Sequence, residues 1–160
     1  MYSLGLFVLR LVLGITFLGH GGQKLFGWFG GPGLKGTIGW MTKMGARPAW
    51  LWGSLAALAE FGGGLLTLLG FLNPLGSLGI IAAMLVAIIQ VHWKKGFWNT
   101  KSGFEFPLMN LTAALALGLT GTGVYSLDAL LKISFPEPVT LLVGLAVVIL
   151  GVVAQQVSQS

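Results

Sequence analysis

Apolar residues fill five long runs of the chain, and glycines, prolines and charged residues separate those runs. A helix needs about 20 mostly apolar residues to cross the hydrocarbon core of a bilayer. Runs that approach this length occupy residues 4–22, 49–70, 75–91, 105–121 and 139–154. The pattern predicts an all-α, polytopic membrane helix bundle: four core transmembrane helices and a fifth, C-terminal helix, in a single transmembrane domain over residues 1–160.

The segment between the first two runs, residues 23–48, has a different character. It carries four basic residues among seven glycines, together with the apolar residues Phe26, Trp28, Phe29, Trp40, Met41 and Met44. Mixed basic and aromatic segments suit the boundary between lipid and water. We therefore expect this segment to lie in the membrane interface or to dip slightly into it.

The basic residues also predict the orientation of the bundle. Seven of the nine Lys and Arg residues fall in the loops 23–48 and 92–104. In a serial bundle these two loops share one face, and short loops rich in Lys and Arg stay on the cytoplasmic side. We expect both loops in the cytoplasm and the N-terminus outside.

Composition narrows the function classes. Charged residues make up 8% of the chain and apolar residues 55%, whereas a soluble domain carries about 25% charged residues. The absence of cysteine excludes disulfides, thiolate nucleophiles and thiolate metal ligands within the chain. The net charge of +5 does not indicate a nucleic-acid partner, because the basic residues are scattered at the ends of apolar runs. The lipid bilayer is the partner that the composition requires.

Two charged residues lie inside apolar runs, Arg10 in the first and Glu60 in the second. A charge within the bilayer is costly and usually finds a partner. Glu60 lies near the middle of its run, and Arg10 lies a few residues to the outer side of the middle of its own. Because the arginine side chain is long enough to reach the same depth, we expect Arg10 to be the buried charge partner of Glu60, by direct pairing or within one polar network. A purely structural pair that holds two helices together is as good an interpretation of these residues as a catalytic one.

A second set of polar residues falls where the runs meet the tryptophan-rich face. In a four-helix bundle these ends converge on one mouth, where helix bundles commonly place a small-molecule site. With Glu60 at its floor, the predicted ligand site consists of His20, Lys24, Gln90, His92, Glu105 and Asn110. The alternative is that these side chains anchor helix ends at the interface.

Other chemistry has little support in the residues. The two histidines and the glutamates show none of the spacings typical of metal ligands, so we predict no metal site. Gly31, Pro32 and Gly33 form a loop motif that favours a turn over a phosphate-binding loop, because no Lys-Ser or Lys-Thr follows at a helix start. No motif encodes a cofactor.

The order of these residues resembles the DoxX family of small bacterial membrane proteins. The resemblance rests on the pattern R-L-x-x-G-x-x-F-x-x-H-G-x-x-K-L-F-G from Arg10 to Gly27, on Glu60 with the glycines and leucines that follow it, and on His92 and Glu105. It extends over residues 4–130. Such proteins are usually four-helix bundles of the bacterial inner membrane, and the fifth run departs from that pattern.

The resemblance implies a link to redox chemistry. Members are associated with sulfur and thiol oxidation, and a related protein is a subunit of a thiosulfate:quinone oxidoreductase. It implies that this chain is a membrane component of a redox system, that a quinone is the candidate ligand, and that soluble redox enzymes are candidate partners. A membrane anchor that recruits soluble oxidoreductases and a small-molecule or lipid permease are the alternatives. Oligomerisation stays open.

Overall fold

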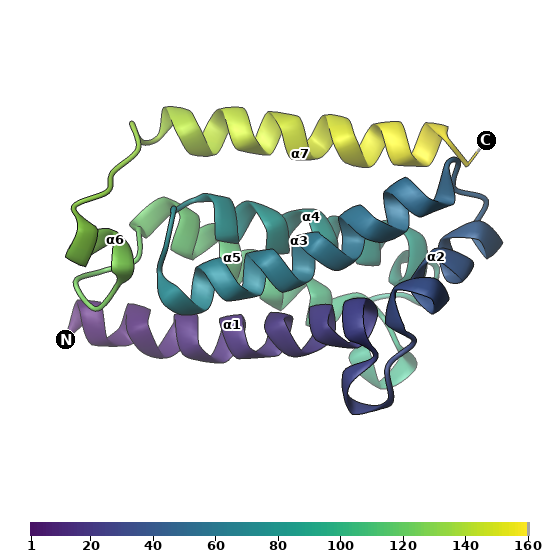
Figure 1. Ribbon diagram of the computed structural model, residues 1–160, viewed down its shortest axis with the longest axis horizontal. Coiled ribbons are helices and arrows are strands. Elements are labelled where there is room, and N and C mark those ends of the chain that lie inside the picture. The colour runs from purple at the N-terminus through teal and green to yellow at the C-terminus, as the bar shows by residue number, and fades with distance from the viewer. Residues whose placement is uncertain (160) are drawn as a thin grey trace.

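The computed structural model describes residues 1–159, and within this range all regular secondary structure is helical, with no strand. Figure 1 shows the long helices side by side, with short helices at the two ends of the bundle. The long helices are α1 (Tyr2–Phe26), α3 (Ala49–Leu69), α4 (Leu75–Ala87), α5 (Glu105–Thr120) and α7 (Val139–Val157). The short ones are η1 (Trp28–Gly30), α2 (Gly33–Lys43), η4 (Asn99–Lys101) and α6 (Leu127–Leu131). The predicted fold class is confirmed.

Four helices are long and apolar enough to cross a membrane: α1, α3, the continuous helix Leu75–Lys95 that begins as α4, and α7. The first of them is longer than its apolar run, since α1 ends only at Phe26, where Gly27 adopts a left-handed conformation with φ 75°. The fifth run of the sequence is thus a long helix. By contrast, α5 has 16 residues, about 24 Å at 1.5 Å per residue.

The segment expected at the interface forms η1 and then α2, which lies across one end of the bundle (Figure 1). Helix α2 packs against both α1 and α3. Thr37 and Met41 face inward and are buried, whereas Trp40 is exposed. The helix is therefore amphipathic, with one face on the bundle and one face turned outward.

Glycines set the distance between α1 and α3. A Cβ atom on Gly14 would lie 2.7 Å from the backbone of Leu68, and one on Gly64 would lie 2.7 Å from the carbonyl carbon of Phe17. A Cβ on Gly21 would collide with the backbone of Phe61. Small residues let two helix backbones approach closely in a membrane, where packing drives helix association. These contacts fix the antiparallel register of α1 and α3.

Helix α4 is the centre of the bundle. It packs against α3, α5 and α7, and its residues Ile80 and Ile81 are almost wholly buried. Together with Leu13 and Phe17 of α1 and Leu117 of α5, they belong to the hydrophobic core. Beyond Ala87 the helix continues as a π-helix, η2 (Ile88–His92), and then as a 3₁₀ turn, η3 (Trp93–Lys95).

Helix α7 lies along the opposite side of the bundle from α1 (Figure 1) and packs against α4. Near its start Leu141 is buried, and Gly144 allows Leu78 of α4 to approach. Near its end the amide N–H of Arg47 donates to the Ser158 hydroxyl at 3.4 Å. Both ends of α7 are thus attached to the rest of the bundle.

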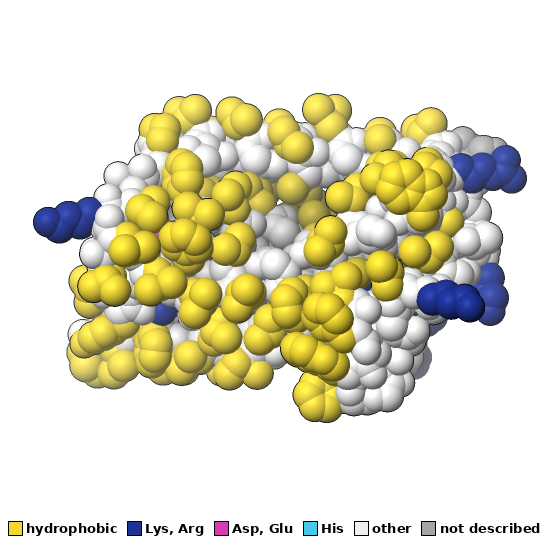
Figure 2. All heavy atoms as spheres, viewed as in Figure 1, with side chains coloured by type: hydrophobic (Ala, Val, Ile, Leu, Met, Phe, Trp, Pro, Cys, Tyr) yellow, Lys and Arg dark blue, Asp and Glu magenta, His cyan; other side chains and the backbone are white. Residues whose placement is uncertain are grey.

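The surface agrees with a bilayer environment. Figure 2 shows apolar side chains over the face in view, and Lys and Arg side chains at the two ends of the bundle. Large apolar side chains such as Val12, Leu58 and Leu142 are exposed along the helices. The chain is a multi-pass membrane protein, because a water-exposed surface of this kind would be unfavourable.

The glycine packing of α1 and α3 gives a testable prediction with a control on the same helix. Gly64→Ala places a methyl group against the backbone of α1, whereas Gly62→Ala has no heavy atom within 4 Å of the new Cβ. Overpacking costs about 1–3 kcal/mol. In detergent, we expect Gly64→Ala to lower the apparent melting temperature by several degrees and Gly62→Ala to leave it unchanged. Equal melting temperatures for the two variants would contradict the packing argument.

Candidate functional site

A cavity of about 470 Å³ lies between α2, α3, α4 and α7. Figure 2 shows a hollow in the apolar face between α7 and α3. Most of the lining is apolar, with Ala and Val side chains from α4, Leu55 and Trp52 from α3, and Val148 and Val152 from α7. The polar side chains in the lining are few: Lys24, Thr37, Glu60, His92 and Gln155.

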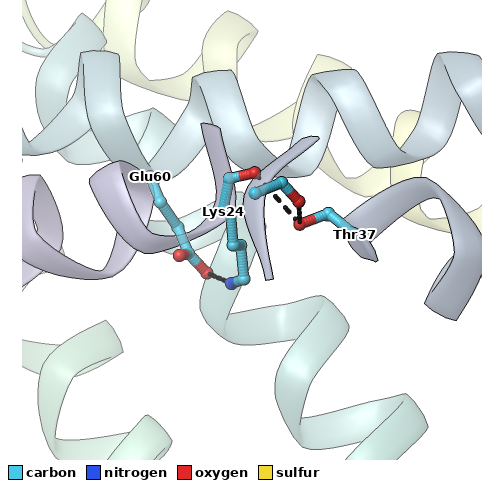
Figure 3. A network of polar contacts seen from close by, with 4 residues as sticks. Lys24, Thr37 and Glu60 are labelled. Carbon is cyan, nitrogen blue, oxygen red and sulfur yellow. Dashed lines mark hydrogen bonds and ion pairs between the residues drawn. The ribbon is translucent and has the colours of Figure 1, made fainter. Parts of the chain in front are cut away.

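Lys24 and Glu60 form an ion pair at the wall of the cavity, with the ammonium group of Lys24 donating to Oε1 of Glu60 (Figure 3). Lys24 lies in the last turn of α1, and Glu60 lies near the middle of α3. The antiparallel register places Gly21 against Phe61, so the two side chains lie one turn or less apart along the interface. Glu60 is 5% exposed, and its second oxygen, Oε2, is buried without a hydrogen bond from any residue that the structure describes.

Thr37 connects α2 to this ion pair. Its hydroxyl oxygen lies 3.1 Å from the carbonyl oxygen of Lys24 and 2.9 Å from that of Gly33, and its one proton is shared between these two acceptors (Figure 3). Thr37 is buried. The contact holds α2 against the end of α1, and so it fixes the backbone from which Lys24 reaches Glu60.

His92 enters the lining at the end of the π-helix η2. Single π-helical turns often occur at functional sites, because they rotate the residues that follow. The Nδ1 atom of His92 lies 2.6 Å from the carbonyl oxygen of Ser102. A carbonyl only accepts hydrogen bonds, so Nδ1 carries the proton, and Nε2 is the ring nitrogen left for another partner.

The predicted pair of Arg10 and Glu60 does not form. A Cβ on Gly70, at the end of α3, would collide with Nη1 of Arg10, and Gly70 is ten residues, or about 15 Å of helix, from Glu60. The prediction compared depths along two isolated runs. The glycine register between α1 and α3 instead brings Lys24 to Glu60 and takes Arg10 to the opposite end of the bundle.

Arg10 has its own surroundings. It is 1% exposed, and its Nη2 donates to the carbonyl oxygen of Tyr125. The nearby carboxylate of Asp128 accepts from the amide N–H groups of Leu72 and Asn73 at 2.8 and 2.9 Å. The Nε and Nη1 atoms of Arg10 and the hydroxyl of Thr67 are buried without partners beside a void of about 10 Å³. A void of that size is at the lower limit for one water molecule.

The remaining predicted site residues lie outside the cavity lining. His20 is exposed on α1, 6.5 Å from the ring of Phe17. Glu105 accepts from the amide N–H of Asn99 at 2.9 Å, and Asn110 donates to the carbonyl oxygen of Phe106 at 3.0 Å. These two side chains stabilise a loop and a helix turn.

Gln90 and the loop motif also lie elsewhere. The amide of Gln90, within the π-helix, is buried without a partner. Gly31, Pro32 and Gly33 connect η1 to α2, and a Cβ on Gly31 would lie 2.5 Å from the side chain of Gln23. The motif is thus a tight turn packed on α1. Within residues 1–159, no group of three His, Cys, Asp or Glu residues lies close enough to hold a metal ion.

Sequence reasoning missed two parts of the cavity. Thr37, Trp40 and Met41 of α2 line it, although their segment was expected only at the interface. Gln155 of α7 lines it as well and is 3% exposed. Thr37 and Met41 are four residues apart, which is the spacing of one helix face, and this spacing was the available signal that α2 has an inward face. Gln155 gave no such signal, because it resembled the start of a polar tail.

Comparison with known proteins places the chain in a family context. The profile of the DoxX family matches residues 5–93. The chain is 34% identical over 133 residues to the inner membrane protein YqjF of Escherichia coli strain K12, covering 81% of this chain and 94% of the relative. It is 29% identical over 127 residues to the putative oxidoreductase CatD of Bacillus subtilis strain 168, covering 79% and 87%. No solved structure matches the chain.

The pairing of Lys24 with Glu60 can be tested by charge reversal. We expect Lys24→Glu and Glu60→Lys each to destabilise the protein by roughly 1–2 kcal/mol, less than a fully buried pair because Lys24 is 33% exposed. The double reversal should restore part of the lost stability. Thermal unfolding in detergent measures the stability of the two single variants and the double variant. If the double variant is as unstable as the sum of the single variants, the two residues are not coupled.

The contact between Arg10 and Gly70 gives a second test. Gly70 and Gly27 each end a helix in the left-handed region, with φ +62° and φ +75°, and a new Cβ on Gly27 would meet no heavy atom closer than 3.4 Å. Both Gly70→Ala and Gly27→Ala introduce backbone strain of about 1–2 kcal/mol, but only the first displaces Arg10. We expect a clearly lower melting temperature for Gly70→Ala than for Gly27→Ala. Similar values would show that Arg10 is not held at Gly70.

Proposed function

The chain belongs to the DoxX family of membrane proteins, and from this premise we propose that it is a membrane component of a redox system that binds a quinone or a similar lipophilic ligand. The observation that carries the proposal is the apolar cavity of about 470 Å³ with the Lys24–Glu60 ion pair in its wall. Ligand sites are typically cavities of about 300–1,000 Å³ with apolar walls and a few polar groups.

The location of the cavity supports a ligand dissolved in the membrane. Trp40 and Leu55 line it and are also 39% and 47% exposed on the lipid-facing surface. Beyond the C-terminal end of α2, Ala46 is buried, as is Met41 within the helix, and the hydrogen bond between the Arg47 amide and the Ser158 hydroxyl connects the corner between α2 and α3 to the end of α7. We propose that the cavity opens to the lipid at Trp40 and Leu55, where a quinone ring with its apolar tail can enter from the bilayer.

The polar groups suit the oxygen atoms of such a ligand. The ammonium group of Lys24 has three N–H donors, and the ion pair with Oε1 of Glu60 uses one of them. The ammonium can donate a second hydrogen bond to a carbonyl oxygen in the cavity. Full reduction of a quinone takes up two electrons and two protons, and Lys24, Glu60 and His92 are groups of this chain that can hold a proton beside the ligand.

The electrons come from outside the chain in this proposal. With no cysteine, the chain has no thiol relay of its own, so we propose soluble redox enzymes as the electron donors. One relative is named a putative oxidoreductase. The other is named an inner membrane protein, and we place this chain in the bacterial inner membrane with its basic loops in the cytoplasm and its N-terminus outside.

A second candidate function is a membrane anchor that recruits such enzymes. It is favoured by the exposed basic side chains on the two loops of one face, at Lys43, Arg47, Lys94, Lys95 and Lys101. An anchor retains its soluble partner when Lys24 and Glu60 are neutralised. A ligand-dependent redox component loses turnover under the same change. Turnover of the copurified soluble enzyme with the neutralised variant distinguishes the two functions, because an anchor keeps it and a quinone-binding component loses it.

Ligand binding tests the leading proposal. We expect Lys24→Met to weaken binding of 2-methyl-1,4-naphthoquinone by about 10- to 100-fold, the effect of losing a hydrogen bond from a charged donor. Isothermal titration calorimetry in detergent measures the affinity. Lys101→Met removes the same charge from an exposed loop residue and should have no effect.

Folding of the variant is controlled separately. Lys24→Met together with Glu60→Gln leaves no unpaired charge in the cavity wall, so this double variant keeps its fold and still binds weakly. If both variants bind the naphthoquinone as the unmodified protein does, Lys24 does not contact the ligand and the proposed site is wrong.

A further inference from the structure

Gln155 is an unusual residue for its position. It lies near the end of α7, whose sequence from Val139 to Ala154 contains one polar residue, Thr140. The side chain of Gln155 is 3% exposed and lines the cavity. A buried amide in an apolar helix is unfavourable unless its hydrogen-bonding groups are satisfied.

The hydrogen bonding of Gln155 is incomplete. Within the described residues its side chain makes one hydrogen bond, in which Nε2 donates to the sulfur of Met41 at 3.6 Å. A side-chain amide offers two N–H donors and an oxygen with two lone pairs, and a thioether is a weak acceptor. The amide therefore has one unused donor and an unused acceptor at the cavity wall, which is where a ligand atom can supply the partner.

Gln155 and the ion pair lie at different walls of the same cavity. Lys24 reaches Glu60 on α3, whereas Gln155 projects from α7, and Figure 2 shows the hollow between these two helices. Helix α2 bridges the walls: Thr37 contacts the backbone of Lys24, and Met41, one turn further along, contacts Gln155. The ion pair and the amide of Gln155 thus reach the same cavity from different helices.

We propose that Gln155 is a specificity-determining residue that binds a second oxygen of the ligand, on the far side of the ring from the oxygen bound by Lys24. The inference rests on the proposed function and adds to it. The cavity then selects flat, lipophilic molecules with oxygen atoms at two opposite ring positions over molecules with one. Discrimination arises because a ligand without the second oxygen leaves the buried amide of Gln155 unpaired.

Two ligands and two variants test this role. The ligands are 2-methyl-1,4-naphthoquinone, with two carbonyl groups on opposite sides of one ring, and 1-tetralone, a fused-ring ketone with one. The variants are Gln155→Met, which keeps the size of the side chain and removes the amide, and Gln156→Met, which makes the same change at the next residue, outside the cavity lining. Calorimetry in detergent gives the four affinities and those of the unmodified protein.

We expect the unmodified protein to bind the naphthoquinone about tenfold more tightly than the tetralone, the effect of one hydrogen bond. Gln155→Met should abolish this preference by weakening naphthoquinone binding alone, and Gln156→Met should retain it. Equal weakening of both ligands by Gln155→Met, or no weakening of either, overturns the role of Gln155 and leaves the cavity as a ligand site. Failure of both ligands to bind the unmodified protein overturns the proposed function itself.

Discussion

The close contact between α1 and α3 determines the arrangement of the polar residues. Glycines at positions 14, 21 and 64 allow the two backbones to touch, and the touching surfaces permit one antiparallel register. That register brings the last turn of α1 to the middle of α3, so Lys24 meets Glu60. It also carries Arg10 to the end of α3, beside Gly70. Helices in lipid gain little from burying apolar surface, so close packing of the two backbones drives their association. The positions of the charged residues follow from that packing.

The cavity exists because α3 packs closely on α1 and α4 but not on α7. Helix α7 packs against α4 and is joined to the α2–α3 corner near its end, and the space between α7 and α3 is lined by alanines, valines and a few larger side chains. Helix α3 is thus held by backbone contacts on two sides, and the side that faces α7 is hollow. The ion pair lies at this boundary, where α1 ends and α2 covers it, so a charged group that stabilises the bundle also faces a space large enough for a ligand.

The sequence predicts the long helices well, because apolar length carries that information directly, although α5 is too short to count among the helices that could cross a membrane. The predicted end of the first run, residue 22, is four residues early, because the glycines there, with His20, Gln23 and Lys24 around them, suggest a break, whereas the helix continues until Gly27 turns it. Charge pairing was not predictable in the same way. Depth along a span indicates which residues lie at one level, but a partner also requires the rotation and register of two helices, which depend on Gly14 and Gly64. Gln155 was missed because a polar residue near the end of an apolar run is indistinguishable by pattern from the start of a tail.

The shortness of α5 has a consequence for the surrounding lipid. A hydrocarbon core is about 30 Å thick, and the 16 residues of α5 provide about 24 Å, while Phe106, Met109 and Leu119 on this helix are exposed. Lipid chains beside α5 must therefore shorten or splay to match it, whereas those beside the longer α1 need not. The protein imposes a thickness gradient around its perimeter. Such a gradient carries an elastic cost that favours thin membranes or a neighbouring protein at the α5 face.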